Sequence, residues 1–175
     1  MALPELIEIV PLSGPVHAHI TVPGAKSITN RALRLAALAE GATTLTGALW
    51  SEDTQIMVTA LQAMGFGVTV VEDPVEPGNR TITVQGQGGQ IPKIPKDLFV
   101  GNAGTAARFL AALVCLGTGQ VKLHGIDRMH QRPQGELFQA LRALGYTVDA
   151  LNDKLPATIH GTGPRAGACT VSLQE

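Results

Sequence analysis

Apolar residues recur at helical spacing in four stretches of the chain. Residues 30–39 and 105–116 each predict a helix that follows a glycine-containing turn. Two further helices are predicted by apolar positions three or four residues apart, which are Ile56, Met57, Ala60, Leu61 and Met64 in one and Leu137, Phe138, Leu141 and Leu144 in the other. Each of these two helices ends at a glycine, Gly65 or Gly145, as expected for a C-cap.

Short segments rich in β-branched residues lie between and after these helices, and each predicts a strand. They are Thr43–Leu49, Gly67–Val71, Thr81–Val84, Gln120–His124, Tyr146–Leu151 and Ala157–His160. Residues 72–80 and 86–97 are rich in proline, glycine and charge, so we expect connecting loops there.

The order of these elements repeats along the chain, and three sequence matches support a duplication. The segment LAAL at 35–38 recurs at 110–113, and "LQAMGFGV" from Leu61 recurs as "LRALGYTV" from Leu141. The glycine pair at 41 and 47 has a counterpart at 119 and 125. Each copy then reads as a leading strand followed by helix, strand, helix, strand and strand, which predicts an α/β fold of two βαβαββ units.

Composition and charge exclude several classes of function. The chain of 175 residues has a formal net charge of −1, which argues against a broad nucleic-acid or membrane footprint. No segment reaches transmembrane length, and the N-terminus lacks the pattern of a secretory signal, so we expect a cytoplasmic protein. Cys115, Cys169 and the histidines lack metal-ligand spacing, so we expect reduced, structural cysteines and no metal site.

The first helix of each copy begins with basic residues, although helix starts usually favour acidic ones. Lys26, Ser27, Asn30 and Arg31 follow the first glycine turn, and no acid occurs between Glu8 and Glu40. The second copy opens with "GNAGTAARFLAAL" from Gly101, in which Asn102 and Thr105 could cap the helix and Arg108 lies in the first turn. Uncompensated backbone N–H groups and basic side chains at a helix start favour anion binding, although capped helices with solvated basic residues are the alternative.

Arg132 belongs to a third segment that is a candidate for anion binding. Pro133 suits the first position of a helix and disfavours a helical conformation at the residue before it, so Arg132 is predicted to be extended. A guanidinium held there could bind a carboxylate or phosphate with two hydrogen bonds, or it could be an ordinary surface arginine. The residues alone thus indicate an α/β protein that binds small, multiply anionic compounds, and the absence of a P-loop motif argues against nucleotide hydrolysis.

Three motifs, in this order, resemble one family: "PGAKSITNRAL" from Pro23, "GNAGTAARFL" from Gly101 and "DRMHQRP" from Asp127. They are similar to the motifs of 5-enolpyruvylshikimate-3-phosphate (EPSP) synthases, which need no cofactor. That family transfers the enolpyruvyl group of phosphoenolpyruvate to the 5-hydroxyl of shikimate 3-phosphate and is built from six βαβαββ units, three per domain.

The resemblance implies a role for each candidate residue. Lys26 would be catalytic and contact both substrates, while Ser27 and Arg31 would bind shikimate 3-phosphate. The phosphoenolpyruvate pocket, where glyphosate competes in this family, would be formed by Asn102, Gly104, Thr105 and Arg132.

The chain departs from many relatives at Phe109, where they have proline, which puts helix geometry and glyphosate sensitivity in doubt. A sister family acts on UDP-N-acetylglucosamine, but it has asparagine at the position of Ser27 and a reactive cysteine at that of Asp127. A non-catalytic anion-binding module is the other alternative.

The resemblance also implies an incomplete enzyme. Residues 1–20 would belong to the other domain of full-length relatives, and residues 21–175 would form a partial substrate-binding domain with units at 21–97 and 98–165 and the start of a third. Other catalytic residues would lie downstream. A complementary C-terminal half, or self-association, is therefore expected, and the chain alone is expected to be inactive.

Overall fold

The computed structural model describes residues 6–171 as two consecutive α/β units. The first unit consists of α1 (Lys26–Leu38), β1 (Glu40–Leu49), α2 (Glu52–Ala63), β2 (Gly67–Glu72) and β3 (Asn79–Gln87). The second consists of β4 (Asp97–Phe99), α3 (Gly104–Val114), β5 (Thr118–His124), α4 (Asp127–Gln131), α5 (Gly135–Ala143), β6 (Thr147–Ala150), the short 3-10 helix η1 (Leu151–Asp153) and β7 (Ala157–Thr162).

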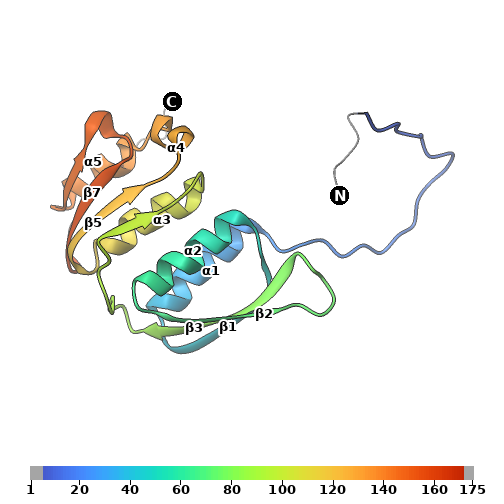
Figure 1. The fold of residues 1–175 in the computed structure, drawn as a ribbon, viewed down its shortest axis with the longest axis horizontal. Coiled ribbons are helices and arrows are strands. Elements are labelled where there is room, and N and C mark those ends of the chain that lie inside the picture. The colour runs from blue at the N-terminus through green and yellow to red at the C-terminus, as the bar shows by residue number, and fades with distance from the viewer. Residues whose placement is uncertain (1–5, 172–175) are drawn as a thin grey trace.

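Each unit has one sheet. The strand order is β1-β3-β2 in the first sheet and β4-β5-β7-β6 in the second, and all neighbours are antiparallel except the parallel pair β4–β5. The helices α1, α2 and α3 contact one another, and in Figure 1 α1 and α2 lie beside the first sheet while α3 lies beside β5 of the second. One cluster of buried side chains runs through both units, from Leu33 and Ile82 in the first to Phe138 and Ile159 in the second. The two units therefore share a core.

The predicted duplication is visible in the helix ends. In α2 the N–H groups of Gly65 and Phe66 donate to the carbonyls of Gln62 and Leu61, at 2.9 and 3.0 Å. In α5 those of Gly145 and Tyr146 donate to Arg142 and Leu141 at the same two distances. Both glycines have φ of +86°, so both helices end in the same Schellman motif.

The structure corrects the register of one sequence match. Gly86 lies so close to the carbonyls of Ala36 and Ala39 that it has no room for a side chain, and Gly161 meets Val114 and Gly117 in the same way. These contacts align α1 with α3 at an offset of 78 residues, as Gly41 and Gly119 also do. The LAAL segments, 75 residues apart, are therefore not equivalent. The two offsets differ by three residues, which is almost one helical turn. A helix face rich in Ala and Leu therefore shows a similar sequence one turn away from the equivalent position.

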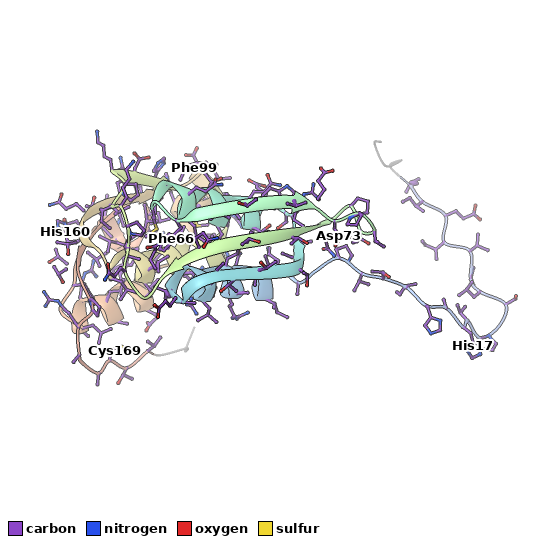
Figure 2. The ribbon with its side chains drawn as sticks, turned by 90° about the horizontal axis from the view of Figure 1, so that it is seen from below. His17, Phe66, Asp73, Phe99, His160 and Cys169 are labelled. Atoms are coloured by element: carbon purple, nitrogen blue, oxygen red, sulfur yellow. The ribbon has the colours of Figure 1, made fainter. Side chains whose placement is uncertain are left out.

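The expectation of two complete units is wrong for the first unit. No strand precedes α1 among the described residues, because residues 6–25 form neither helix nor strand. Residues 6–22 run away from the body in Figure 1, and Figure 2 shows His17 far from it. That residues 1–20 belong to another domain stays a prediction, and residues 1–5 lie outside the described part. Residues 166–171 likewise contain no element of the expected third unit, and 172–175 are not described.

Other predicted elements are confirmed with shifted ends. The first helix begins four residues earlier than predicted, at Lys26, and β3 extends to Asn79–Gln87. The predicted loop 86–97 contains the last residues of β3 and the first of β4. Pro133 does not start a helix, because α5 begins at Gly135 and the five-residue α4 precedes the proline. Within the described residues, no helix is long and apolar enough to cross a membrane.

Candidate active site: basic helix starts

The start of α1 has the properties expected of an anion site. Lys26 is the first helical residue and follows Ala25, which has no side chain able to cap the helix. No acidic residue lies in the first turn, so the positive end of the helix dipole is not compensated within α1 itself. Because the helix begins at Lys26 rather than at residue 30, both Lys26 and Ser27 belong to this first turn.

Lys26 has a partner that the sequence reasoning did not identify. Its Nζ lies 3.2 Å from Oδ2 of Asp53, in the first turn of α2, and the lysine side chain is about half exposed. Asp53 lies in the sequence between Ser51 and Thr54, which form the capping box of α2. Acids are common at this position of a helix, so the sequence around Asp53 does not mark it as unusual. Only the tertiary contact distinguishes it. Lys26 is thus held by a carboxylate that an incoming anion would have to replace.

Arg31 lies between its own helix and an aromatic ring. Its Nη1 donates to the carbonyl of Ser27 at 3.3 Å, and its guanidinium carbon is 5.9 Å from the ring centre of Phe109 on α3. Arg34 lies closer to that ring, at 4.4 Å, within the range of a cation–π contact. Phe109 therefore joins α1 to α3 through the two arginines, and this is a contact that proline at this position could not make.

The start of α3 differs from the prediction in its cap. Asn102 and Thr105 do not cap the helix, because Ala103 is the N-cap residue and no side chain makes a capping hydrogen bond there. Instead, the backbone carbonyl oxygen of Asn102 accepts a hydrogen bond of 3.1 Å from Nη1 of Arg132. No acidic residue lies in this first turn either. Like α1, the helix begins with its positive end uncompensated.

Arg132 lies over this helix start, where Gly104 leaves room for it. A Cβ atom built on Gly104 would be 2.6 Å from Nη2 and 2.8 Å from Cζ of Arg132, so only glycine allows the guanidinium to come this close. Arg132 is extended, as predicted, with φ −77° and ψ 138°. Arg108 supports the arrangement, because its Nη1 and Nη2 donate to the carbonyls of Gly104 and Pro133 at 3.2 and 3.0 Å.

The first turn of α2 connects the two basic groups. On one side, Asp53 pairs with Lys26. On the other, a Cβ on Gly101 would be 2.8 Å from Cδ1 of Ile56 and 3.5 Å from Oε1 of Glu52. The starts of α1, α2 and α3 therefore meet at one end of the helix layer. The residues alone predicted a basic helix start in each copy, and the fold brings the two starts together around the acidic first turn of α2.

The two cysteines differ in their surroundings. Cys115 is buried, its thiol donates to the carbonyl of Ala111 at 3.3 Å, and burial raises the pKa of this thiol to about 11. Cys169 is exposed in the segment after β7, so the expected structural role holds for Cys115 alone. Both are free thiols, and the described residues contain no group of three or more His, Cys, Asp or Glu side chains that could hold a metal ion.

The fold and the joined basic helix starts define an α/β protein in which two helices with basic starts begin side by side. Residues 10–174 match the sequence model of the family described as EPSP synthase (3-phosphoshikimate 1-carboxyvinyltransferase). The chain is 45% identical over 179 residues to the 3-phosphoshikimate 1-carboxyvinyltransferase of Opitutus terrae, covering 100% of this chain and 40% of that protein. It is 45% identical over 159 residues to the enzyme of that name from Nostoc sp. strain PCC 7120, covering 90% of this chain and 36% of the relative.

A solved structure agrees with the sequence matches. EPSP synthase from Acinetobacter baumannii superposes with a TM-score of 0.75 at 30% identity, covering 85% of this chain and 33% of that one. The chain belongs to the EPSP synthase family, as the three motifs predicted. It spans about two fifths of the length of the curated relatives that it matches.

Proposed function

We propose that this chain supplies part of the active site of an EPSP synthase, which transfers the enolpyruvyl group of phosphoenolpyruvate to the 5-hydroxyl of shikimate 3-phosphate and releases phosphate. The observation that carries the proposal is the meeting of the two basic groups at one end of the helix layer, because both substrates are multiply anionic. Family membership and the relatives' shared name support the choice of substrates.

The proposed roles are those that the family resemblance implies, and the positions of Lys26 and Arg132 support them. Lys26 would leave Asp53 to contact both substrates near the reacting centre, and its neighbours Ser27 and Arg31 would bind shikimate 3-phosphate. Arg132 would clamp phosphoenolpyruvate with two hydrogen bonds at the start of α3. Asn102, Gly104 and Thr105 would shape that pocket, since Asn102 and Gly104 already fix where the guanidinium lies.

The experiment needs a complete enzyme. We would join residues 1–175 to the part of the Opitutus terrae relative that lies beyond its match to this chain, and refer to the product as the chimera. Calorimetric titration would give the affinity for shikimate 3-phosphate, and then for phosphoenolpyruvate in its presence. We expect Arg31→Ala to weaken mainly the first and Arg132→Ala mainly the second, each by roughly ten- to a hundredfold, because a charge-assisted hydrogen bond is lost.

Arg34→Ala is the matched control, because Arg34 lies on the same helix and contacts the same ring as Arg31 without an assigned substrate. It should change both affinities by less than about threefold, since no substrate contact is proposed for Arg34. Equal losses of both substrates in the Arg31 and Arg132 variants would contradict the assigned roles. Binding of both substrates by a folded chimera that releases no phosphate would favour the non-catalytic anion-binding module.

A further inference from the structure

Arg31, which is proposed to bind shikimate 3-phosphate, is held by a hydrogen bond and an aromatic ring. Its Nη1 donates to the carbonyl of Ser27, one turn earlier on α1, at 3.3 Å, and its guanidinium carbon lies 5.9 Å from the ring centre of Phe109 on α3. No carboxylate within residues 6–171 forms an ion pair with it. An exposed arginine loses rotamer freedom when it binds a ligand, so a contact that orders the guanidinium beforehand improves affinity.

The ring of Phe109 is a surface fixed by the core. Phe109 is half-buried and packs against the cluster of buried side chains that both units share. The guanidinium carbon of Arg34 lies 4.4 Å from the ring centre, whereas that of Arg31 is close to the limit of about 6 Å for a cation–π contact. Arg34 therefore occupies the nearer position at the ring, and Arg31 occupies the farther one.

These contacts determine where the guanidinium of Arg31 lies. The hydrogen bond to Ser27 holds it over the first turn of α1, where the helix start is uncompensated. Arg34, three residues later on the same helix, carries a like charge, which disfavours a shift of Arg31 toward the C-terminal end of α1. The ring of Phe109 limits movement toward α3. The guanidinium is therefore kept at the helix start, where an anion would bind.

We infer that Phe109 is a positioning residue for Arg31, and that its ring holds the guanidinium in the place from which Arg31 binds shikimate 3-phosphate. Phe109 belongs to α3, whose start carries the proposed phosphoenolpyruvate clamp, but its effect falls on the other substrate. The inference deepens the proposed function and rests on it, because the ligand of Arg31 is taken from there.

Calorimetric titration of the chimera tests the inference. Phe109→Leu keeps an apolar side chain but removes the ring, so we expect it to weaken shikimate 3-phosphate binding by about three- to tenfold. Phosphoenolpyruvate binding, measured at saturating shikimate 3-phosphate, should change by less than about twofold. Phe109→Tyr keeps a ring and should leave both affinities within about twofold. A change in the geometry of α3 would instead weaken phosphoenolpyruvate binding at Gly104 and Arg132, so an equal or larger loss there would overturn the inference.

A double-mutant cycle identifies the residue through which Phe109 acts. In an Arg31→Ala chimera, Phe109→Leu should change the affinity for shikimate 3-phosphate by less than about twofold, because the group that the ring positions is already gone. In an Arg34→Ala chimera the loss of about three- to tenfold should remain. A full loss in the Arg31→Ala background would show that Phe109 does not act through Arg31.

The resonance of the Arg31 Nε–H group, followed by NMR in the 175-residue chain, gives a measurement independent of substrate binding. An aromatic ring shifts the resonances of nearby protons, so Phe109→Leu should move this signal and Phe109→Tyr should largely retain it. Phe99→Leu is the matched control, because Phe99 contacts His124 in the second sheet, with ring centres 5.4 Å apart. An Arg31 signal that responds equally to Phe109→Leu and Phe99→Leu would overturn the inference.

The inference and the proposed function can fail separately. If the unmodified chimera does not bind shikimate 3-phosphate, the proposed function fails, and the assigned purpose of the ring fails with it. If the chimera binds both substrates and releases phosphate, but Phe109→Leu leaves the affinity for shikimate 3-phosphate unchanged, only the inference is wrong.

Discussion

At the scale of single residues, Gly104 is the glycine whose replacement bears most directly on the proposed site. Its missing side chain admits the guanidinium of Arg132, so Gly104→Ala would place a methyl group where Nη2 and Cζ now lie. We expect this change to weaken phosphoenolpyruvate binding by the chimera about tenfold or more, since the clamp is displaced. Calorimetry checks it.

Gly135→Ala is a suitable control for this change, because a Cβ there would meet no atom closer than 3.7 Å, from Asp153. It replaces glycine inside α5, so it should leave affinity unchanged and stabilise the chain slightly. A tenfold loss in the control as well would show that the effect at Gly104 is not specific.

Cys115 predicts a pH dependence of stability. Burial raises the pKa of this thiol from 9.0 to about 11, so the unfolded chain loses its proton at lower pH than the folded chain. The free energy of unfolding should therefore be unaffected by this group below pH 9 and fall between about pH 9 and 11, by at most about 1.4 kcal/mol per pH unit. Urea unfolding at several pH values measures it. In Cys115→Ala this part of the slope should disappear, whereas Cys169→Ala should retain it.

At this scale the sequence identified the basic residues but not their acidic partner. Lys26, Arg31 and Arg132 were recognisable because each lies beside a glycine turn or a proline, which are local signals. Asp53 pairs with Lys26 across 27 positions of sequence, and its surroundings are those of any N-terminal acid of a helix. No local pattern encodes such a contact.

At the scale of elements, Gly86 and Gly161 allow each sheet to pack closely against its helix, and we predict that replacing either one has a similar effect on stability. Gly86→Ala and Gly161→Ala would each drive a methyl group into the carbonyls at the end of α1 or α3. We expect each to lower the free energy of unfolding by at least about 2 kcal/mol, and by similar amounts, because the contacts are equivalent. Chemical denaturation measures both. Gly14→Ala, with no atom within 4 Å, should have no effect, and a mild result at either strand position would contradict the close packing.

Helices and strands could be predicted from the sequence where their signals are local. The alignment of one repeat copy with the other could not. The Schellman ends of α2 and α5 follow from glycines after apolar stretches, and both were predicted. The LAAL match failed because Ala and Leu recur along any apolar helix face, so only the contacts of Gly86 and Gly161 fix the true offset. The helix α4 was missed because five residues are too few to show a period.

At the scale of the whole molecule, we predict that the 175-residue chain alone has no synthase activity. It contributes basic groups that hold anions, while the groups that move protons are expected in the downstream part of the family's length. Phosphate release with both substrates should stay at background for the chain and rise in the chimera. Turnover by the chain alone that Lys26→Ala abolishes would contradict this and would imply a different catalytic arrangement.

The glycine contacts have a consequence for how such repeats diverge. In the first unit Gly24 leaves no room for a side chain against the carbonyl of Gly47, and in the second Gly125 leaves none against the carbonyl of Gly101, so the close approach recurs with the excluded side chain on the opposite partner. What the copies share is therefore the close approach of one backbone segment to another, here and at Gly86 and Gly161, rather than the identity of the residues. Copies of such a unit can therefore keep the same backbone contacts after most of their sequence similarity is lost.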